Sequence, residues 1–401
     1  MLNKVLPLVL LLMLGVSNLP AQGIDAHFTV DKSIHFAGEP VFIALTVSNK
    51  GDKPVWVDFK SPDMPLFCHD FALEVPGAES AAKNWGCGFA GSCGRGLREV
   101  PPGKSISLQQ LLNGEFRLDR LGPYLIQAHT VIEVHDQNLF DSPEVKHLEV
   151  SDTLTVNLQS SSESQLIAAF QPFVEELDSS DDVKRSEAAN AITQLAPPFL
   201  EDVLIQLTKS SYAYAAIVAL RKANTLKTRI ALAQLATSSG DSTLRVEAIS
   251  NLGRTNDLSY VPALLGLLKS DDKQIQNAAA EAAGNLGGPT AVTRLAALIS
   301  SPDEQTRLAG VNGLGNSHAR QAVPFLIRML LDSDANIRQA AVSGLWLLTH
   351  RAAFEGNQWT DVASQQSAAA VHQRWVLWWN SHGHDSKIHG MSDCDSPQSL
   401  D

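Results

Sequence analysis

The chain has 401 residues, of which 44% are hydrophobic and 18% are charged, and its formal net charge is −12. This length is too great for one ordinary core and indicates two domains or more. An acidic chain with scattered Lys and Arg lacks the basic footprint that nucleic-acid binding needs, so we expect no nucleic-acid partner.

The first 23 residues have the pattern of a secretory signal peptide. Lys4 gives a positive start, an apolar run covers Val5–Val16, and Ala21-Gln22-Gly23 supplies small residues before a cleavage point. We therefore expect cleavage near Gly23 and an exported protein, either periplasmic or secreted. An uncleaved N-terminal anchor is the alternative. No other segment is long and apolar enough to cross a bilayer, so the mature chain is expected to lack a membrane span.

Residues 24–158 predict an antiparallel β-sandwich. Short apolar runs are separated by turns rich in Gly, Pro and Asn, and no long helical pattern lies between them. The runs are Val41–Val47, Val55–Phe59, Tyr124–Val134 and Leu148–Leu158.

Three short pieces of this region resemble bacterial Ig-like modules. They are Gly38-Glu39-Pro40-Val41, Phe116-Arg117-Leu118 and Gly122-Pro123-Tyr124. The resemblance implies an Ig-like sandwich, with Tyr124 at the place where such folds often have a tyrosine corner.

A glycine-rich stretch at residues 85–94 holds two of the four cysteines. Cys87 and Cys93 lie six residues apart and Cys68 precedes them, so we expect a disulfide within this set in an exported protein. The pairing stays open. The alternatives are a metal site of Cys68, His69, Cys87 and Cys93, a catalytic thiol, and a loop that contacts a partner.

A polar linker at residues 159–164 precedes a segment rich in alanine and leucine. From residue 165 to residue 350 this segment is repetitive, with a clear period of 31 residues in its second part. The columns are Asp241, Asp272, Asp303 and Asp334; Arg245, Gln276, Arg307 and Arg338; Ala248, Ala279, Gly310 and Ala341; and Leu252, Ala283, Leu314 and Leu345. We expect about five pairs of short helices.

Each repeat is expected to use its columns in the same way. The aspartate begins the first helix, where its carboxylate meets free backbone N–H groups. The arginine four residues later is expected to reach that aspartate, and Gly253, Gly284 and Gly315 are expected at helix ends. These columns resemble the HEAT-like repeats of the phycobilisome-lyase type. The resemblance implies an α-α solenoid that serves as a binding scaffold.

The last part of the chain departs from the period. Residues 351–382 include a helix with Trp375, Trp378 and Trp379 on one face, and they resemble the closing segment of exported bacterial HEAT proteins. We expect a cap, because the last apolar face of a solenoid has no neighbour; an aromatic binding site is the alternative. Residues 383–401 are expected to be disordered, with metal binding by their histidines as the alternative.

No motif assigns a catalytic, cofactor or metal site. The chain lacks any His-Glu dipeptide, which a di-iron hydroxylase of the HEAT-like type uses, and it lacks nucleotide-binding and hydrolase motifs. We therefore expect a non-catalytic extracytoplasmic scaffold that binds another protein. An enzyme of the HEAT-like lyase or hydroxylase type and a structural envelope protein are the alternatives.

The candidate partner-binding residues are the basic residues of the later second helices and the turn before one of them. They are Arg294, His318, Arg320 and Arg328. On an acidic protein such a basic set would suit an acidic partner segment, and ordinary solvated charge is the alternative.

Overall fold

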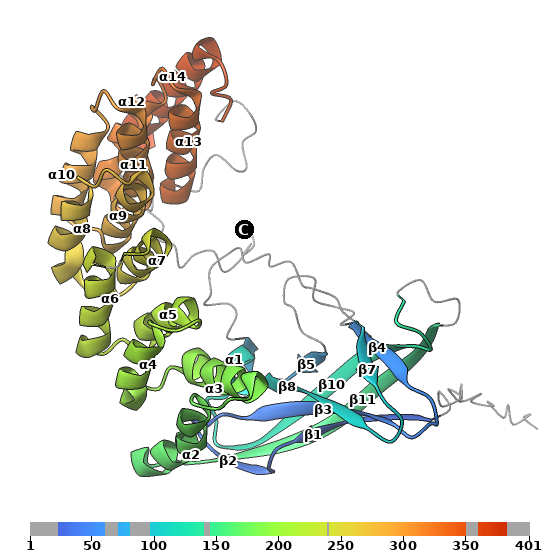
Figure 1. The fold of residues 1–401 in the computed structure, drawn as a ribbon. Coiled ribbons are helices and arrows are strands. Elements are labelled where there is room, and N and C mark those ends of the chain that lie inside the picture. The colour runs from blue at the N-terminus through green and yellow to red at the C-terminus, as the bar shows by residue number, and fades with distance from the viewer. Residues whose placement is uncertain are drawn as a thin grey trace, which may run out of the picture. The chain divides into compact units, whose positions relative to one another are not determined.

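The structure is a computed structural model that describes residues 23–60, 71–80, 97–139, 145–238, 240–349 and 360–382. The chain divides into two compact units, with the boundary between Ser162 and Glu163. The first unit is built mainly of strands and the second of helices (Figure 1). The predicted signal sequence before Gly23, the four cysteines and the tail from residue 383 lie outside the described residues.

Two main sheets make up the first unit. One has the strand order β1-β3-β8 and the other the order β2-β11-β10-β4-β7, with β5 also paired to β10. The described pairings are antiparallel except that of β2 with β11. The bounds are β1 Ile24–Val30, β2 Ile34–Phe36, β3 Phe42–Asn49, β4 Val55–Lys60, β5 Ala72–Glu74, β7 Arg98–Val100, β8 Ser105–Leu111, β10 Gly122–His135 and β11 Val145–Gln159.

A short helix, α1, and a small sheet complete this unit. The bounds are α1 Leu112–Glu115, β6 Glu79–Ser80 and β9 Phe116–Arg117, and β6 pairs with β9. The four predicted strand runs correspond to β3, β4, β10 and β11. The N-terminal region of mainly antiparallel sheet is therefore confirmed.

Apolar side chains from both main sheets form one buried cluster. It includes Ile43 and Leu45 of β3 and Ile126 and Ile132 of β10. Buried and partly exposed side chains alternate along β3, as expected for a strand with one face on a core.

Two polar contacts hold turns of the first unit in place. The Tyr124 hydroxyl accepts a hydrogen bond from the Arg120 backbone N–H at 2.7 Å. The carboxylate of Glu39 is buried, with Oε1 2.7 Å from Nζ of Lys32 and 2.8 Å from Nδ1 of His35. The glutamate of the Gly-Glu-Pro-Val motif thus links the residues around β2 to the segment just before β3.

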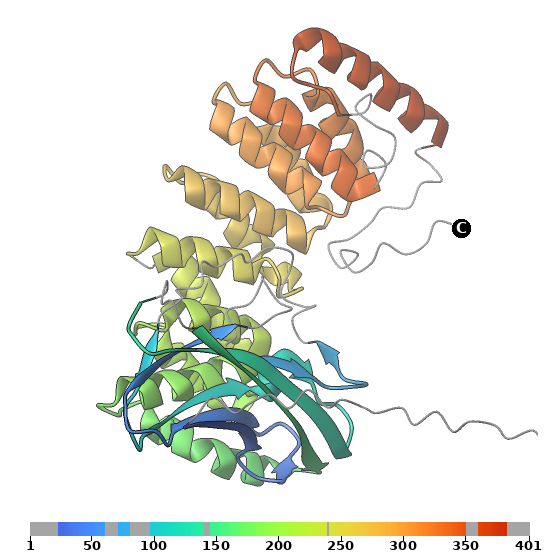
Figure 2. The ribbon, with the colours of Figure 1, turned by 90° about the vertical axis from the view of Figure 1, so that its right-hand side faces the viewer.

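Stacked helices form the second unit. In Figure 1 the first helices of the later repeats, α7, α9, α11 and α13, follow one another along one side of the stack, and the second helices α8, α10 and α12 along the other. Figure 2 shows the same layers after a quarter turn. The bounds are α2 Glu163–Glu176, α3 Asp182–Leu195, α4 Glu201–Leu207, α5 Ala213–Ala223, α6 Leu226–Ser238, α7 Ser242–Leu252, α8 Val261–Leu267, α9 Lys273–Leu286, α10 Pro289–Leu298, α11 Glu304–Gly315, α12 Val323–Met329, α13 Ala335–Thr349 and α14 Gln365–His382.

The repeated columns form the continuous core of this stack. All members of the small-residue column and of the apolar column are buried. They are Ala248, Ala279, Gly310 and Ala341, and Leu252, Ala283, Leu314 and Leu345. The 31-residue period is therefore the period of packing, and the predicted C-terminal helical repeat region is confirmed.

The repeated glycines serve close packing. Gly284 lies inside α9, so the prediction that it ends a helix was wrong. A Cβ atom added at Gly253 would lie 2.5 Å from the Cα of Ala282, and one at Gly315 would lie 2.8 Å from the Cα of Gly344. Successive first helices approach so closely that only glycine fits. Within the described residues, no helix has both the length and the apolar character needed to cross a membrane.

Candidate functional site

The repeated aspartates cap the first helices, as predicted. The Asp272 carboxylate accepts hydrogen bonds from the backbone N–H groups of Gln274 and Ile275 at 2.9 and 3.3 Å. Equivalent caps are made by Asp181, Asp241, Asp303 and Asp334. Hydrogen bonds from the Lys273 ammonium and from Thr306 lower the pKa of Asp303 to about 2.

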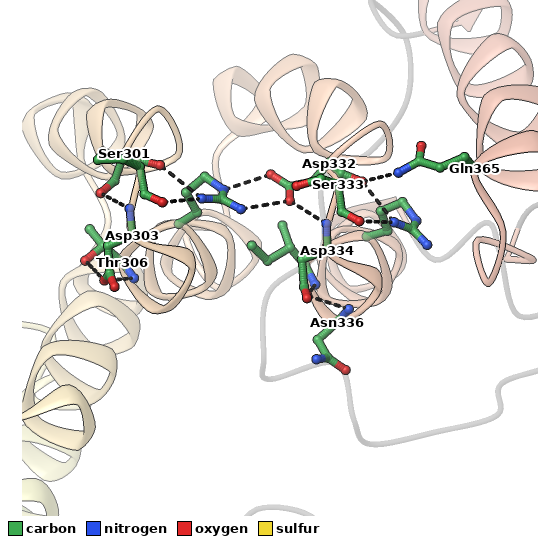
Figure 3. Close-up of polar contacts among 12 residues, drawn as sticks. Ser301, Asp303, Thr306, Asp332, Ser333, Asp334, Asn336 and Gln365 are labelled. Atoms are coloured by element: carbon green, nitrogen blue, oxygen red, sulfur yellow. Dashed lines mark hydrogen bonds and ion pairs between the residues drawn. The ribbon is translucent and has the colours of Figure 1, made fainter.

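Arg307 has partners other than the aspartate that caps its own helix. It donates from Nη1 to the carbonyl oxygens of Ser301 and Pro302, both at 3.1 Å. It donates from Nε and Nη2 to the two carboxylate oxygens of Asp332, at 2.9 and 3.1 Å (Figure 3). The prediction that this arginine pairs with its own capping aspartate was wrong, because the cap carboxylate faces Thr306 and the neighbouring repeat.

Arg338 makes the corresponding bonds one repeat later. Nη1 donates to the carbonyl oxygens of Asp332 and Ser333 at 2.9 and 3.0 Å. Nε and Nη2 donate to the carbonyl oxygens of Val362 and Ala363 at 2.8 and 2.9 Å. Each arginine therefore joins the turn before its own helix to the segment that begins the next element of the stack.

The N-terminal ends of the first helices are also joined from repeat to repeat. Ser242 Oγ donates to Oδ2 of Asp272 at 2.5 Å, and Lys273 Nζ donates to Oδ2 of Asp303 at 2.8 Å. Each donor is the first residue of one helix, and each acceptor caps the next. Glu304 occupies the equivalent place in the following repeat and has no proton to donate when ionised. The arginine three residues later supplies the link there instead.

A second polar row runs between first helices. Nε of Arg221 on α5 donates to Oδ1 of Asn251 on α7 at 2.9 Å. Nδ2 of Asn312 on α11 donates to Oδ1 of Asn277 on α9 at 3.1 Å, and Oε1 of Glu281 accepts from Asn277 at 2.9 Å. Burial raises the pKa of Glu281, against the effect of these amide donors. Sequence reasoning missed this row, although Glu281 and Asn312 occupy one column of the period.

The structure places the candidate partner-binding residues on three elements. Arg294 lies on α10 and Arg328 on α12; both side chains are exposed, and neither forms a hydrogen bond or ion pair with another described residue. The guanidinium carbon of Arg320, just before α12, lies 6.0 Å from the ring centroid of Trp379. His318 is exposed, in the turn between α11 and α12, with φ 49°.

The tryptophans of α14 face the stack. Trp375 and Trp378 are buried, with ring centroids 5.5 Å apart in an edge-to-face arrangement. At the start of α14, Gln365 Nε2 donates to the carbonyl oxygen of Asp332, which follows α12. Near its end, Trp379 lies beneath the arginine that precedes α12. Helix α14 therefore runs antiparallel to α12.

An apolar cavity of 250 Å³ lies between α6, α7 and α8. Its walls are made mainly by the side chains of Ile230, Ala233, Leu252, Leu264 and Leu267. The lining also includes Gln234, Thr237 and Tyr260, but it is mainly apolar and therefore favours an apolar group. Among the described residues, no three His, Cys, Asp or Glu side chains are grouped so that they could hold a metal ion.

Comparison with known proteins agrees with the repeat seen in the helical unit. A family model for HEAT repeats matches residues 228–301 and 292–354. No curated protein shows significant similarity to the chain.

Some solved structures also show detectable similarity to this chain. The complex of CpcE and CpcF of phycocyanin lyase from Nostoc sp. PCC7120 is 18% identical, over 51% of this chain and 82% of that chain, with a TM-score of 0.27. Human deoxyhypusine hydroxylase in complex with glycerol is 15% identical, over 54% and 90%, with a TM-score of 0.28. A designed self-assembling cyclic homooligomer is 16% identical, over 54% and 82%, with a TM-score of 0.14. On the family match and the packing period together, the C-terminal unit of this chain contains HEAT repeats.

Proposed function

We propose that the chain is a non-catalytic, extracytoplasmic scaffold whose helical array binds an acidic segment of another protein. The observation that carries the proposal is the pair of exposed guanidinium groups of Arg294 and Arg328, on second helices of successive repeats. Arginine binds carboxylates through paired N–H donors, so two such groups without a partner among the described residues favour an acidic ligand.

The bonds between repeats support a scaffold role. A binding surface spread over several repeats keeps its spacing only if the repeats do not slide, and the Arg307–Asp332 and Lys273–Asp303 links oppose sliding. A pre-organised surface loses less conformational entropy on binding.

Three further features belong to the same proposal. The first unit is an Ig-like sandwich, supported by its two packed sheets and by the hydrogen bond to Tyr124. Helix α14 caps the array, supported by buried Trp375 and by an outward face that is mostly polar apart from Leu377. Export rests on the leader-like pattern of residues 1–23.

Charge reversal of the two exposed arginines tests the binding surface. Full-length Arg294→Glu/Arg328→Glu protein is used as bait in an envelope extract, and captured proteins are quantified by mass spectrometry. The partner should be lost from this bait and retained by wild type, and its capture should weaken at high salt.

A second bait controls for the change in net charge. Lys53 and Lys104 are exposed in the first unit, so Lys53→Glu/Lys104→Glu makes the same change in net charge without altering a residue of the array. Equal capture of every protein by the wild type and the double arginine variant would reject the proposed surface. N-terminal sequencing of the mature protein tests export, and an intact Met1 on the exported form would contradict cleavage near Gly23.

A further inference from the structure

The segment that follows α14 carries a charge opposite to that of the exposed arginines. Residues 383–401 contain Asp385, Asp393, Asp395 and Asp401 against the single cation of Lys387. Most of the neighbouring acidic groups of the array are already engaged, as caps of first helices or as partners of arginines. This segment is therefore a concentrated source of carboxylates in the same chain.

The position of α14 brings the start of this segment to the arginine side. Helix α14 runs antiparallel to α12 and ends at His382, whose ring stacks on Trp378 at a centroid distance of 6.3 Å. One residue after Trp378, the ring of Trp379 lies beneath the guanidinium of Arg320. The chain thus leaves the helix within about one turn of an arginine that precedes α12.

The length of the segment allows it to reach the other two arginines. Nineteen residues span at most about 65 Å when extended, whereas the seven residues of α12 rise only about 10 Å. Arg320 and Arg328 flank or end that short helix, and Arg294 lies on α10, the preceding second helix. The segment is therefore long enough to contact all three arginines. We call this set the arginine surface: Arg294, Arg320 and Arg328.

We propose that residues 383–401 bind the arginine surface of their own chain and compete there with the acidic partner. This inference rests on the proposed function, because it gives the same surface two alternative occupants. Exposed ion pairs are individually weak. A tethered segment, however, has an effective concentration in the millimolar range, so weak contacts suffice for substantial occupancy. The tail then sets a threshold that only a stronger acidic ligand overcomes.

A fluorescein-labelled peptide of residues 383–401 serves as the probe, with Cys394→Ser to prevent disulfide formation. Its binding is measured by fluorescence anisotropy to wild-type full-length protein and to a full-length variant with all four tail aspartates changed to Asn. We expect the neutral-tail variant to bind about tenfold more tightly, because its own tail no longer competes. The difference should disappear at about 1 M salt, where the Debye length is about 3 Å.

Two matched reagents make the result specific. A peptide with the same four aspartates replaced by Asn should not bind. The neutral-tail protein with Arg294→Ser, Arg320→Ser and Arg328→Ser should also lose the probe, while Lys104→Ser in the same background should keep it. Binding that is absent from the neutral-tail protein, or that survives the three arginine changes, would overturn the proposal.

The partner assay separates this inference from the proposed function. If the arginine changes abolish partner capture but the tail peptide does not bind, the scaffold proposal stands and the competing tail is rejected. If the peptide binds at the arginines but partner capture is unaffected by them, the tail contact stands as self-association and its role as competitor is rejected.

Discussion

The two units of this chain place their polar side chains differently. In the β-unit, ionisable side chains such as Glu39, His35 and Asp58 are buried at single places with no repeat. In the helical unit, aspartates recur at the starts of first helices, where each caps its helix, and Asp272 and Asp303 also bond to the preceding repeat. The buried core of the helical unit consists almost wholly of Ala, Leu, Val and Ile.

This difference predicts that the two units respond differently to substitutions. The sheets depend on pairings between distant segments, for example β10 with β11 along fourteen residue pairs, so a lost tie weakens the unit as a whole. Repeats contact mainly their neighbours, so a lost contact in the array loosens one region first. Four measurements test this difference. Each uses proteolysis in urea with peptide-level mass spectrometry or hydrogen exchange, which report the two units separately.

The largest effect is expected for Trp375→Ala in α14. Trp375 is fully buried, and truncating a packed tryptophan costs about 3–5 kcal/mol. Hydrogen exchange should accelerate most in α13 and hardly at all in β10. Leu377→Ala on the same helix is the control, because that side chain is 68% exposed. Unchanged exchange in α13 would show that α14 does not stabilise the end of the array.

A smaller effect is expected for Glu39→Ala in the β-unit. The substitution removes the buried carboxylate next to Lys32 and His35, at a cost of about 2 kcal/mol. All strands of the unit should become cleavable at lower urea together, while the helical unit keeps its midpoint. The exposed Glu74→Ala serves as the control. Loss confined to β2 would contradict cooperative behaviour of the sheets.

Loss of one cap should have a smaller and local effect. Asp334 accepts hydrogen bonds from the backbone N–H groups of Asn336 and Ile337 at the start of α13, and Asp334→Ala should cost about 1 kcal/mol. Exchange should rise in the first turn of α13. Asn336→Ala changes an exposed side chain in the same turn and should leave exchange as it is. Equal effects of the two substitutions would argue against the cap.

A fourth effect separates the units by pH. Burial raises the pKa of Glu115 from 4.5 to about 7, so the folded β-unit holds that proton more tightly than the unfolded chain. Its stability should therefore fall as pH rises from 4.5 to about 7, and Glu115→Gln should remove this slope. The lowered pKa of Asp303 acts in the opposite sense: its contribution to the array is present above pH 4 and is lost as pH falls towards 2. A β-unit with the same pH profile in wild type and Glu115→Gln would refute the first assignment.

Features that depend on neighbours along the chain could be predicted from the sequence alone. The 31-residue period, the helix pairs and the capping aspartates could be predicted, because helix periodicity and N-capping act over three or four residues. The longer strands β3, β4, β10 and β11 could also be predicted, from their apolar runs between turns. The shorter strands β2 and β5, with three residues each, carry too little pattern to be recognised.

The contacts across repeats could not be predicted, because they depend on how the helices stack. Arg307 bonds to Asp332, 25 residues away, because the stacking of successive helices brings that carboxylate nearer than the one four residues before it. The same stacking gives Gly284 its role inside α9 and turns α14 back along α12, so that Trp379 lies beneath Arg320. A period in the sequence shows that repeats stack. The contacts between repeats depend on the distance and rotation from one repeat to the next, which follow from how side chains pack in three dimensions.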